Sequence, residues 1–201
     1  MPPAVIKPEL FFEEYVDFCA HSTERYELVQ GQLKRIPSST VLHSRLAKFL
    51  EQVLDVATAQ AYPEWEVFRE VGQRTSAVSS RLPDLAIVPR AEADQLLKQL
   101  AVFQTPSKLV VELVSSSSAS EDYADKLEEY QALGVTEIWI VDPEGWGAAK
   151  HIGFPKAPTL SIYHREQTGY SVHRFQAGQS IASPIFSTLQ LLAQQIFHAK
   201  A

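Results

Sequence analysis

The sequence contains 201 residues, of which 45% are hydrophobic and 21% charged, a composition typical of one folded domain with a sizeable core. The formal net charge of −6 argues against a protein that coats nucleic acid non-specifically, although it allows nucleic acid to be held locally. The single cysteine, Cys19, excludes an intramolecular disulfide framework and a cysteine-based zinc site. No apolar run approaches the ~20 residues that cross a bilayer. We therefore expect a cytoplasmic protein without a membrane segment.

Hydrophobic periodicity divides the first half of the chain into amphipathic helices and alternating strands. Gly31 predicts a hairpin turn, and Ser38, Ser39 and Thr40 offer N-caps for a long helix. Residues 77–81 predict a loop. The expected elements are a helix from Pro8 to about Ala20, strands on both sides of Gly31, a helix from about Leu42 to Gln60, and strands in residues 65–71 and 82–89.

Buried strands dominate the second half, and the pattern changes after Pro143 to antiparallel strands. The strand–helix–strand order before Pro143 predicts a right-handed βαβ crossover. The expected elements are a helix from Ala91 to about Leu100, a strand at Leu109–Val114, a helix from about Glu121 to Leu133, strands in residues 137–143, 160–166, 169–175 and 179–186, and a closing helix in residues 189–197. We therefore predict one α/β domain over residues 1–201, with an N-terminal helix in residues 1–22 and the antiparallel strands and closing helix in residues 148–201.

Two acidic residues occupy unusual places in this pattern. Glu112 lies in the middle of an apolar strand, where an unpaired carboxylate is costly unless a cation, a proton or a metal ion compensates it. Asp84 opens another apolar strand directly after Pro83. Converging carboxylates can bind Mg²⁺ through oxygen. The alternatives are a buried salt bridge for Glu112 and a turn or cap role for Asp84.

The helix after the serine-rich loop supplies a cation. Asp122 and Lys126 lie four residues apart and share a face, and Lys126 is next to the packing side, from which it could reach the sheet. The alternative is an ordinary Asp–Lys pair on the surface.

Several motifs stand in a fixed order along the chain. They are YELVQGQL, SSTVLH, PDLAIV, LVVELVSSSS, a helix with D-x-x-x-K-x-x-E-Y, and GVTEIWIVDP. Together they resemble the Uma-type family of restriction endonucleases, part of the PD-(D/E)xK nuclease superfamily, from about Tyr26 to the C-terminal region. The resemblance implies a restriction-endonuclease-like fold, in which helices flank a mixed sheet and the C-terminal strands are antiparallel.

The superfamily pattern is an Asp after Pro, followed by a strand with Glu-x-Lys. Asp84 matches the first acid and Glu112 the second, but Val114 stands where the lysine is usual. In Uma-type proteins the lysine is thought to come from the following helix, and Lys126 occupies that place. The resemblance implies that Lys126 orients the nucleophile and stabilises charge on the phosphate.

The resemblance also implies a metal site and further residues beside it. Asp84, Glu112 and the backbone carbonyl of Leu113 would hold Mg²⁺, with Mn²⁺ as a possible substitute, and the ion would polarise the phosphate and activate a water. Glu27 matches an extra acid near the metal, which would hold a second ion or a metal-bound water. His43 matches a histidine at the start of the long helix.

We therefore expect a Mg²⁺-dependent endonuclease that acts on DNA as a homodimer. One alternative is a catalytically inactive module of the same fold that binds nucleic acid or protein. Another is a metal-free hydrolase with Glu27 and Glu112 as an acid–base pair. The remaining histidines lack ligand spacing, and the three tryptophans are expected in the core or in an interface. These tryptophans are Trp65, Trp139 and Trp146.

Overall fold

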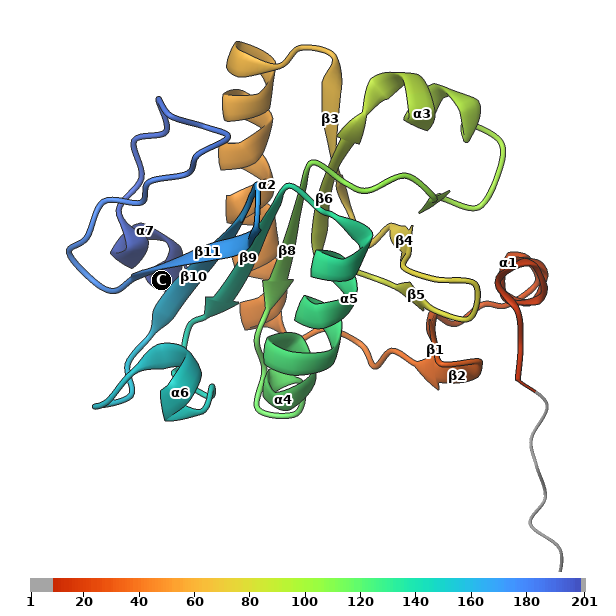
Figure 1. The fold of residues 1–201 in the computed structure, drawn as a ribbon, viewed down its shortest axis with the longest axis horizontal. Coiled ribbons are helices and arrows are strands. Elements are labelled where there is room, and N and C mark those ends of the chain that lie inside the picture. Colours follow the sequence, from red (N-terminus) through yellow and green to blue (C-terminus); the bar gives the residue numbers. More distant parts are fainter. Residues whose placement is uncertain (1–8, 200–201) are drawn as a thin grey trace, which may run out of the picture.

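The computed structural model describes residues 9–199, which form two mixed sheets flanked by helices (Figure 1). This arrangement confirms the predicted mixed α/β class, although the sequence predicted one sheet where the structure has two. No helix in residues 9–199 combines the length and the apolar character that spanning a membrane requires.

The larger sheet brings together strands from the middle and the end of the chain. Neighbouring β8 and β9 are parallel, which confirms the predicted crossover, and every other neighbouring pair in this sheet is antiparallel. In order across the sheet the strands are β11 (Gly169–Phe175), β10 (Thr159–Glu166), β9 (Glu137–Asp142), β8 (Leu109–Leu113), β6 (Leu85–Pro89) and β3 (Trp65–Arg69).

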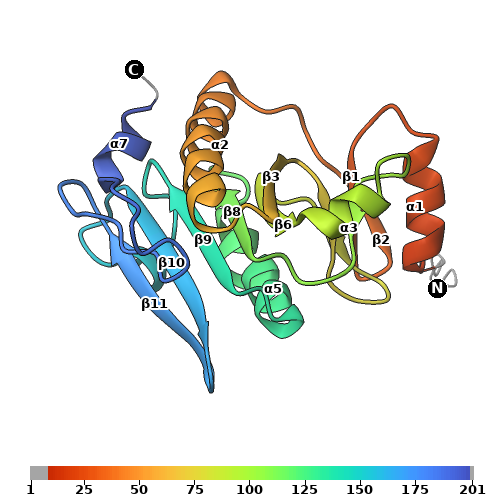
Figure 2. The same ribbon diagram turned by 90° about the horizontal axis from the view of Figure 1, so that it is seen from above.

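Helices cover both faces of this sheet, as the view from above shows (Figure 2). The long helix α2 (Val41–Ala61) packs on one face, and α5 (Leu127–Leu133) packs on the other. Leu113 belongs to the core beneath α2, whereas Val110 and Val114 belong to the core beneath α5. Because side chains alternate along a strand, Glu112 points to the α5 side.

The smaller sheet lies at the other end of the molecule, beside α1 (Phe12–Ala20) (Figure 2). Phe12 and Tyr15 of this helix share a core with Leu28 and Val102. The strands in order are β2 (Gln32–Arg35), β1 (Tyr26–Val29), β5 (Ser80–Arg81), β4 (Gly72–Arg74) and β7 (Val102–Phe103). The hairpin predicted at Gly31 is confirmed as β1 and β2.

Three predictions in the first half of the chain need correction. The first helix begins at Phe12, and the part of its predicted range before residue 9 lies outside the described residues. The predicted loop 77–81 contains β5, because Ser80 pairs with Leu28 at the edge of the hairpin. The helix predicted from Ala91 to Leu100 is only α3 (Arg90–Gln95), because the chain then turns so that β7 can pair with β4.

Two predictions near the C-terminus are also wrong. Residues 179–186 form no strand and contribute only a bridge between Ser180 and Leu192. Pro184 has no N–H for a ladder, and the hydroxyl of Ser183 instead donates to the buried carboxylate of Glu137. The closing helix is limited to α7 (Ala193–Phe197).

The helix predicted from Glu121 to Leu133 is present in three consecutive parts. They are α4 (Ala119–Glu121), the π-helical segment η1 (Asp122–Lys126) and α5. The predicted end at Gly134 is confirmed, since this glycine adopts a left-handed conformation with φ of 89°. A short helix that the sequence did not predict, α6 (Ala149–Ile152), follows β9.

Candidate active site

Glu112 is buried in β8 and both of its carboxylate oxygens have partners. Lys126 Nζ lies 2.9 Å from Oε2, and the hydroxyl of Tyr130 donates to Oε1 at 2.6 Å. Only 2% of Glu112 is exposed. The salt bridge that we considered as an alternative for Glu112 is therefore present, and its partner is the lysine that the family resemblance indicated.

The π-helical segment η1 turns two charged residues toward the sheet. Asp122 and Lys126 are both buried, so the pair does not lie on the surface as the alternative held. Lys126 Nζ is 3.4 Å from Asp122 Oδ1, and Asp122 Oδ2 accepts a hydrogen bond from Ser118 at 2.6 Å. A π-helical turn carries an extra residue compared with an α-helical turn, and such turns often occur at functional sites.

Glu27 reaches the same lysine from the other sheet. Its Oε1 lies 3.4 Å from Lys126 Nζ and accepts a hydrogen bond from the backbone N–H of Leu82 at 3.0 Å. Its Oε2 lies 3.4 Å from the guanidinium of Arg81. The structure thus brings together Glu27, Glu112 and Lys126, three of the residues that the family resemblance indicated.

Arg81 is a site residue that the sequence analysis missed. It is 1% exposed, and it also forms ion pairs with Glu121 and Glu129. Its place directly before Leu82, Pro83 and Asp84 was the only signal, and the two-residue strand β5 that buries it is too short to predict from periodicity.

Asp84 lies just before β6 and joins α2 to β8. Its Oδ1 is 2.8 Å from His43 Nε2, and its Oδ2 accepts a hydrogen bond from the backbone N–H of Leu113 at 2.6 Å. His43 is in the first turn of α2, where its backbone N–H donates a hydrogen bond to the side-chain hydroxyl of the N-cap residue Thr40. Asp84 therefore binds the backbone of Leu113, the residue that follows Glu112. Its other oxygen contacts His43 at the start of α2.

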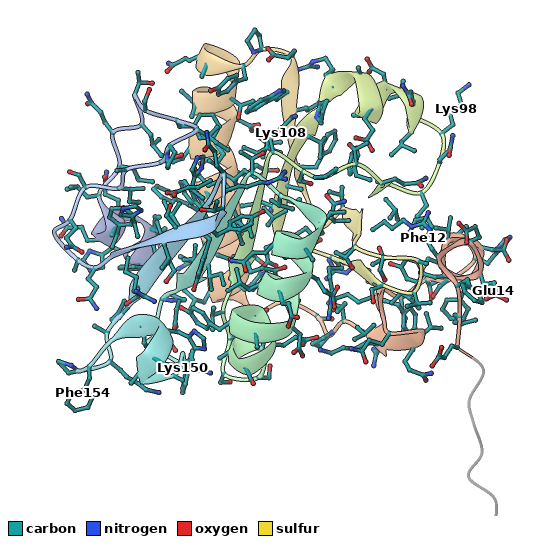
Figure 3. The ribbon with its side chains drawn as sticks, in the orientation of Figure 1. Phe12, Glu14, Lys98, Lys108, Lys150 and Phe154 are labelled. Atoms are coloured by element: carbon teal, nitrogen blue, oxygen red, sulfur yellow. The ribbon has the colours of Figure 1, made fainter. Side chains whose placement is uncertain are left out.

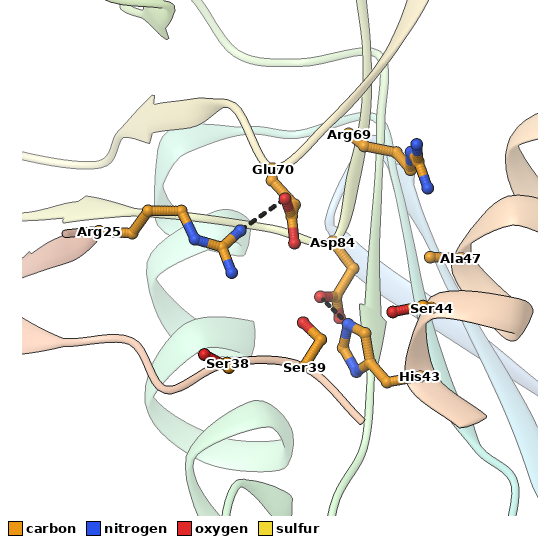
Figure 4. A pocket seen from close by; sticks show the side chains of 9 residues that line it. All are labelled: Arg25, Ser38, Ser39, His43, Ser44, Ala47, Arg69, Glu70 and Asp84. Carbon is orange, nitrogen blue, oxygen red and sulfur yellow. Dashed lines mark ion pairs between the residues drawn. The ribbon is translucent and has the colours of Figure 1, made fainter. Parts of the chain in front are cut away.

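A cavity of about 330 Å³ opens beside Asp84 (Figure 4). Asp84 pairs with His43 at one side of it, and Arg25 pairs with Glu70 at the other. Its lining is rich in hydroxyl groups and charged side chains, and consists of Arg25, Ser38, Ser39, His43, Ser44, Ala47, Arg69, Glu70 and Asp84. Hydroxyl and guanidinium donors of this kind suit an anionic ligand such as a phosphate.

The electrostatics of the buried cluster follow from burial and crowding. Burial raises the pKa of Glu112 to about 8; Lys126 opposes this rise, while the acids Asp122, Asp84 and Glu27 reinforce it. The contact with Lys126 is therefore a full ion pair above this pH and a hydrogen bond to a neutral carboxyl below it. Burial likewise raises the pKa of Asp122. Burial acts to lower the pKa of Lys126, but the surrounding carboxylates outweigh it and raise that pKa well above its usual value, so the lysine is a cation. The hydrogen bond to Asp84 raises the pKa of His43 against the effect of burial.

The donor chemistry of this cluster fits Mg²⁺. Carboxylate oxygens are its preferred protein ligands, and it commonly takes one or two carboxylates together with water and substrate phosphate. Four acids act on Lys126, so carboxylates outnumber the ammonium group in this cluster. They are Glu112, Glu27, Asp122 and Asp84. Within residues 9–199, no group of three or more His, Cys, Asp or Glu side chains is arranged to hold a metal ion. An ion would therefore rely on few protein ligands.

Comparison with known proteins places the chain in a family. The Uma2 family, described as "Putative restriction endonuclease", matches residues 12–194, and the chain belongs to this family. A search of curated proteins finds no match.

Among solved structures, the chain is similar to a crystal structure described as a "putative nuclease belonging to DUF820" from Anabaena variabilis. The two share 16% sequence identity with a TM-score of 0.72, over 96% of this chain and 99% of that one. At this identity the likeness establishes the fold, and the family points to a nuclease.

Proposed function

We propose that this protein is a Mg²⁺-dependent nuclease that hydrolyses phosphodiester bonds in DNA. The observation that carries the proposal is the buried ion pair of Lys126 and Glu112, next to an aspartate, Asp84, that lines a cavity. Burying a lysine among several carboxylates costs desolvation free energy, and ionisable groups perturbed in this way cluster at functional sites. Membership of the Uma2 family supports the same reading.

The proposed metal ligands are Asp84, Glu112 and the backbone carbonyl of Leu113. Asp84 already contacts the backbone of Leu113, so these groups come from adjoining strands. When bound, Mg²⁺, or Mn²⁺ in its place, supplies Lewis-acid stabilisation of the phosphate and a more acidic water. Tyr130 and Lys126 hold the Glu112 carboxylate in place by donating to its two oxygens.

Lys126 is the proposed catalytic cation. Because its pKa is raised, it stays protonated and can donate to the attacking oxygen or to a phosphate oxygen as negative charge develops there. Glu27 and Asp122 keep the ammonium near Glu112, and His43 holds Asp84 through the hydrogen bond at Oδ1. Arg25 and Arg69 in the cavity wall are paired with Glu70 and Glu51, and they would have to exchange these partners to contact the DNA backbone.

We further propose a homodimer. The edge strand β11 of the larger sheet has a neighbour on one side only, and a second copy could pair with its open edge. Sedimentation of the purified protein gives the oligomeric state directly.

Titration with divalent ions tests the proposed function against its rivals. Supercoiled plasmid and linear duplex DNA are incubated with the protein in EDTA, in Mg²⁺ and in Mn²⁺, and nicks and breaks are counted on gels. Cleavage that needs the ion supports the nuclease. A wild-type protein that binds DNA without cleaving it under any of these conditions would favour the inactive binding module, and metal-free hydrolysis of a glycoside would favour the acid–base pair of Glu27 and Glu112.

A further inference from the structure

The loop between β9 and β10 exposes two aromatic side chains. Phe154 is 89% exposed and Trp146 is 48% exposed, whereas Trp139 is buried in the core and Trp65 stacks on Tyr62. Of the two places predicted for the tryptophans, the core and an interface, the core is therefore excluded for Trp146. The two exposed aromatic rings in this short segment offer flat apolar faces to a ligand.

The same loop carries more positive than negative charge, although the whole chain has a net charge of −6. Lys150 and Lys156 stand in residues 145–156, and one exposed acid, Glu144, directly precedes this segment. Both lysines are exposed, and Phe154 and Lys150 lie at the same corner of the molecule, far from Lys98 (Figure 3). Aromatic rings interleaved with lysines favour a ligand that has both flat apolar faces and negative charge.

The loop is held rigidly at its base. The buried carboxylate of Asp142, the last residue of β9, accepts hydrogen bonds from the backbone N–H groups of Trp146 at 2.9 Å and Gly147 at 2.7 Å. Gly147 packs so closely on Tyr123 that a Cβ atom there would lie 2.8 Å from its ring. The exposed rings thus project from an anchored platform.

This platform rests on the segment that carries the catalytic lysine. Tyr123 belongs to η1, and its ring stacks on His151 of the loop with centroids 4.8 Å apart. β8 and β9 are parallel, so the loop leaves the sheet at the same edge as the end of β8, next to Glu112. The loop therefore lies at the same end of the sheet as the candidate active site.

We propose that residues 145–156 bind a single-stranded or unpaired segment of the nucleic-acid substrate, with Trp146 and Phe154 stacking on bases and Lys150 and Lys156 pairing with phosphates. This inference rests on the proposed nuclease function and extends it by naming the substrate as nucleic acid with accessible base faces. In a duplex the base faces are covered by their neighbours, so the aromatic rings favour single strands or junctions over continuous duplex DNA.

Binding without cleavage tests the inference. A fluorescently labelled single-stranded oligonucleotide is titrated with the protein in EDTA and anisotropy is recorded. We expect Phe154→Ala to weaken binding about tenfold, while Leu97→Ala, which removes a side chain that is 79% exposed and lies outside this loop, leaves it unchanged. The wild type should also bind the single strand more tightly than the matching duplex.

The lysines and the tryptophan give two further readouts. Lys150→Ala and Lys156→Ala should each reduce the slope of log affinity against log salt by about 0.7, whereas Lys98→Ala should not. Oligonucleotide should quench the fluorescence of Trp146, and Trp146→Phe should lose most of the quenching while it retains binding.

The outcomes separate this inference from the proposed function. Wild-type affinity of Phe154→Ala and of the lysine variants, or no binding of the oligonucleotide by the wild type, overturns the inference even if plasmid is cleaved in Mg²⁺. A change in the sedimentation of Phe154→Ala with unchanged affinity also overturns it, because the surface is then an interface between copies. Binding that depends on Phe154, in a protein that never cleaves, overturns the proposed function and leaves this surface standing.

Discussion

Lys126 and Glu112 lie 14 residues apart in the sequence, and their side chains meet at 2.9 Å inside the molecule. Glu112 comes from the strand β8, and Lys126 comes from the π-helical segment η1, which follows this strand in the sequence. Val114 stands two residues after Glu112, at the position where the superfamily pattern that the sequence resembles has a lysine. Its side chain lies on the same face of β8 as that of Glu112. The ammonium group thus reaches the carboxylate from the helix instead of the strand.

Replacing Lys126 by alanine should abolish cleavage and lower stability. The substitution leaves Glu27, Glu112 and Asp122 buried without their shared cation, which costs about 3–5 kcal/mol in the free energy of unfolding. Urea unfolding and plasmid cleavage measure the two effects, with Lys98→Ala as an exposed control. Wild-type cleavage by Lys126→Ala would overturn the proposed mechanism.

A second substitution can test whether the lysine may come from the strand. In Val114→Lys combined with Lys126→Ala, the new side chain starts on the same face of β8 as Glu112. We expect partial return of cleavage, measured as the initial rate in Mg²⁺ relative to Lys126→Ala alone. Val110→Lys with Lys126→Ala is the matched control on the same face of β8. Equal cleavage rates in the two double variants would show that a lysine at position 114 does not take the place of the Lys126 ammonium group.

Removal of the buried acid should alter how stability depends on pH. The pKa of Glu112 is raised from 4.5 to about 8 in the folded state, chiefly by burial. Below pH 4.5 the carboxyl is protonated in both states. Between these values the unfolded chain releases its proton and the folded chain keeps it, so stability falls as pH rises, up to about pH 8. In urea unfolding, the free energy of unfolding should therefore fall less between pH 5 and pH 8 for Glu112→Gln than for the wild type. An equal fall would contradict the raised pKa.

Millimolar Mg²⁺ should raise the melting temperature of the wild type at pH 8. Under the proposed function the ion would bind only the folded cluster and offset part of its negative charge, and binding to the folded state alone stabilises that state. Asp84→Asn and Glu112→Gln should lose this shift, and Asp94→Asn, an exposed control on α3, should keep it. A wild type whose melting temperature ignores Mg²⁺ would argue against the metal site while leaving the fold unaffected.

Loss of the histidine should be milder than loss of the lysine. His43 contacts Asp84 and positions it, so His43→Ala should reduce cleavage about 10–100-fold without abolishing it. Its pKa is raised in the folded state, so the stability that protonation contributes is present at low pH and is lost as pH rises through the folded pKa. The stability difference between wild type and His43→Ala should accordingly be larger at pH 5.5 than at pH 8.

The strands of the larger sheet could be predicted because their signals are local, and the family resemblance linked Lys126 with Glu112. An acid in an apolar strand and a lysine at the edge of a helix face are visible in the sequence, and the structure brings Glu112 and Lys126 together. The burial of Asp122 could not be predicted, because a regular α-helix was assumed and η1 has a wider turn. Arg81 was missed because its burial depends on β1 and β4, which lie on both sides of it in the smaller sheet. Such non-local pairing leaves no periodic pattern.

The carboxylate of Glu27 belongs to the smaller sheet, and that of Glu112 belongs to the larger one, yet both lie next to one ammonium group. The complete set of charges around Lys126 therefore requires both sheets. A fragment that starts after β2 would retain Asp84, Glu112 and Lys126, but it would lose the acid that anchors the lysine from the far side and the partner that Arg81 has in β1. Grafting the strand and helix motif onto another scaffold would transfer the sequence signature of the site without its full charge balance.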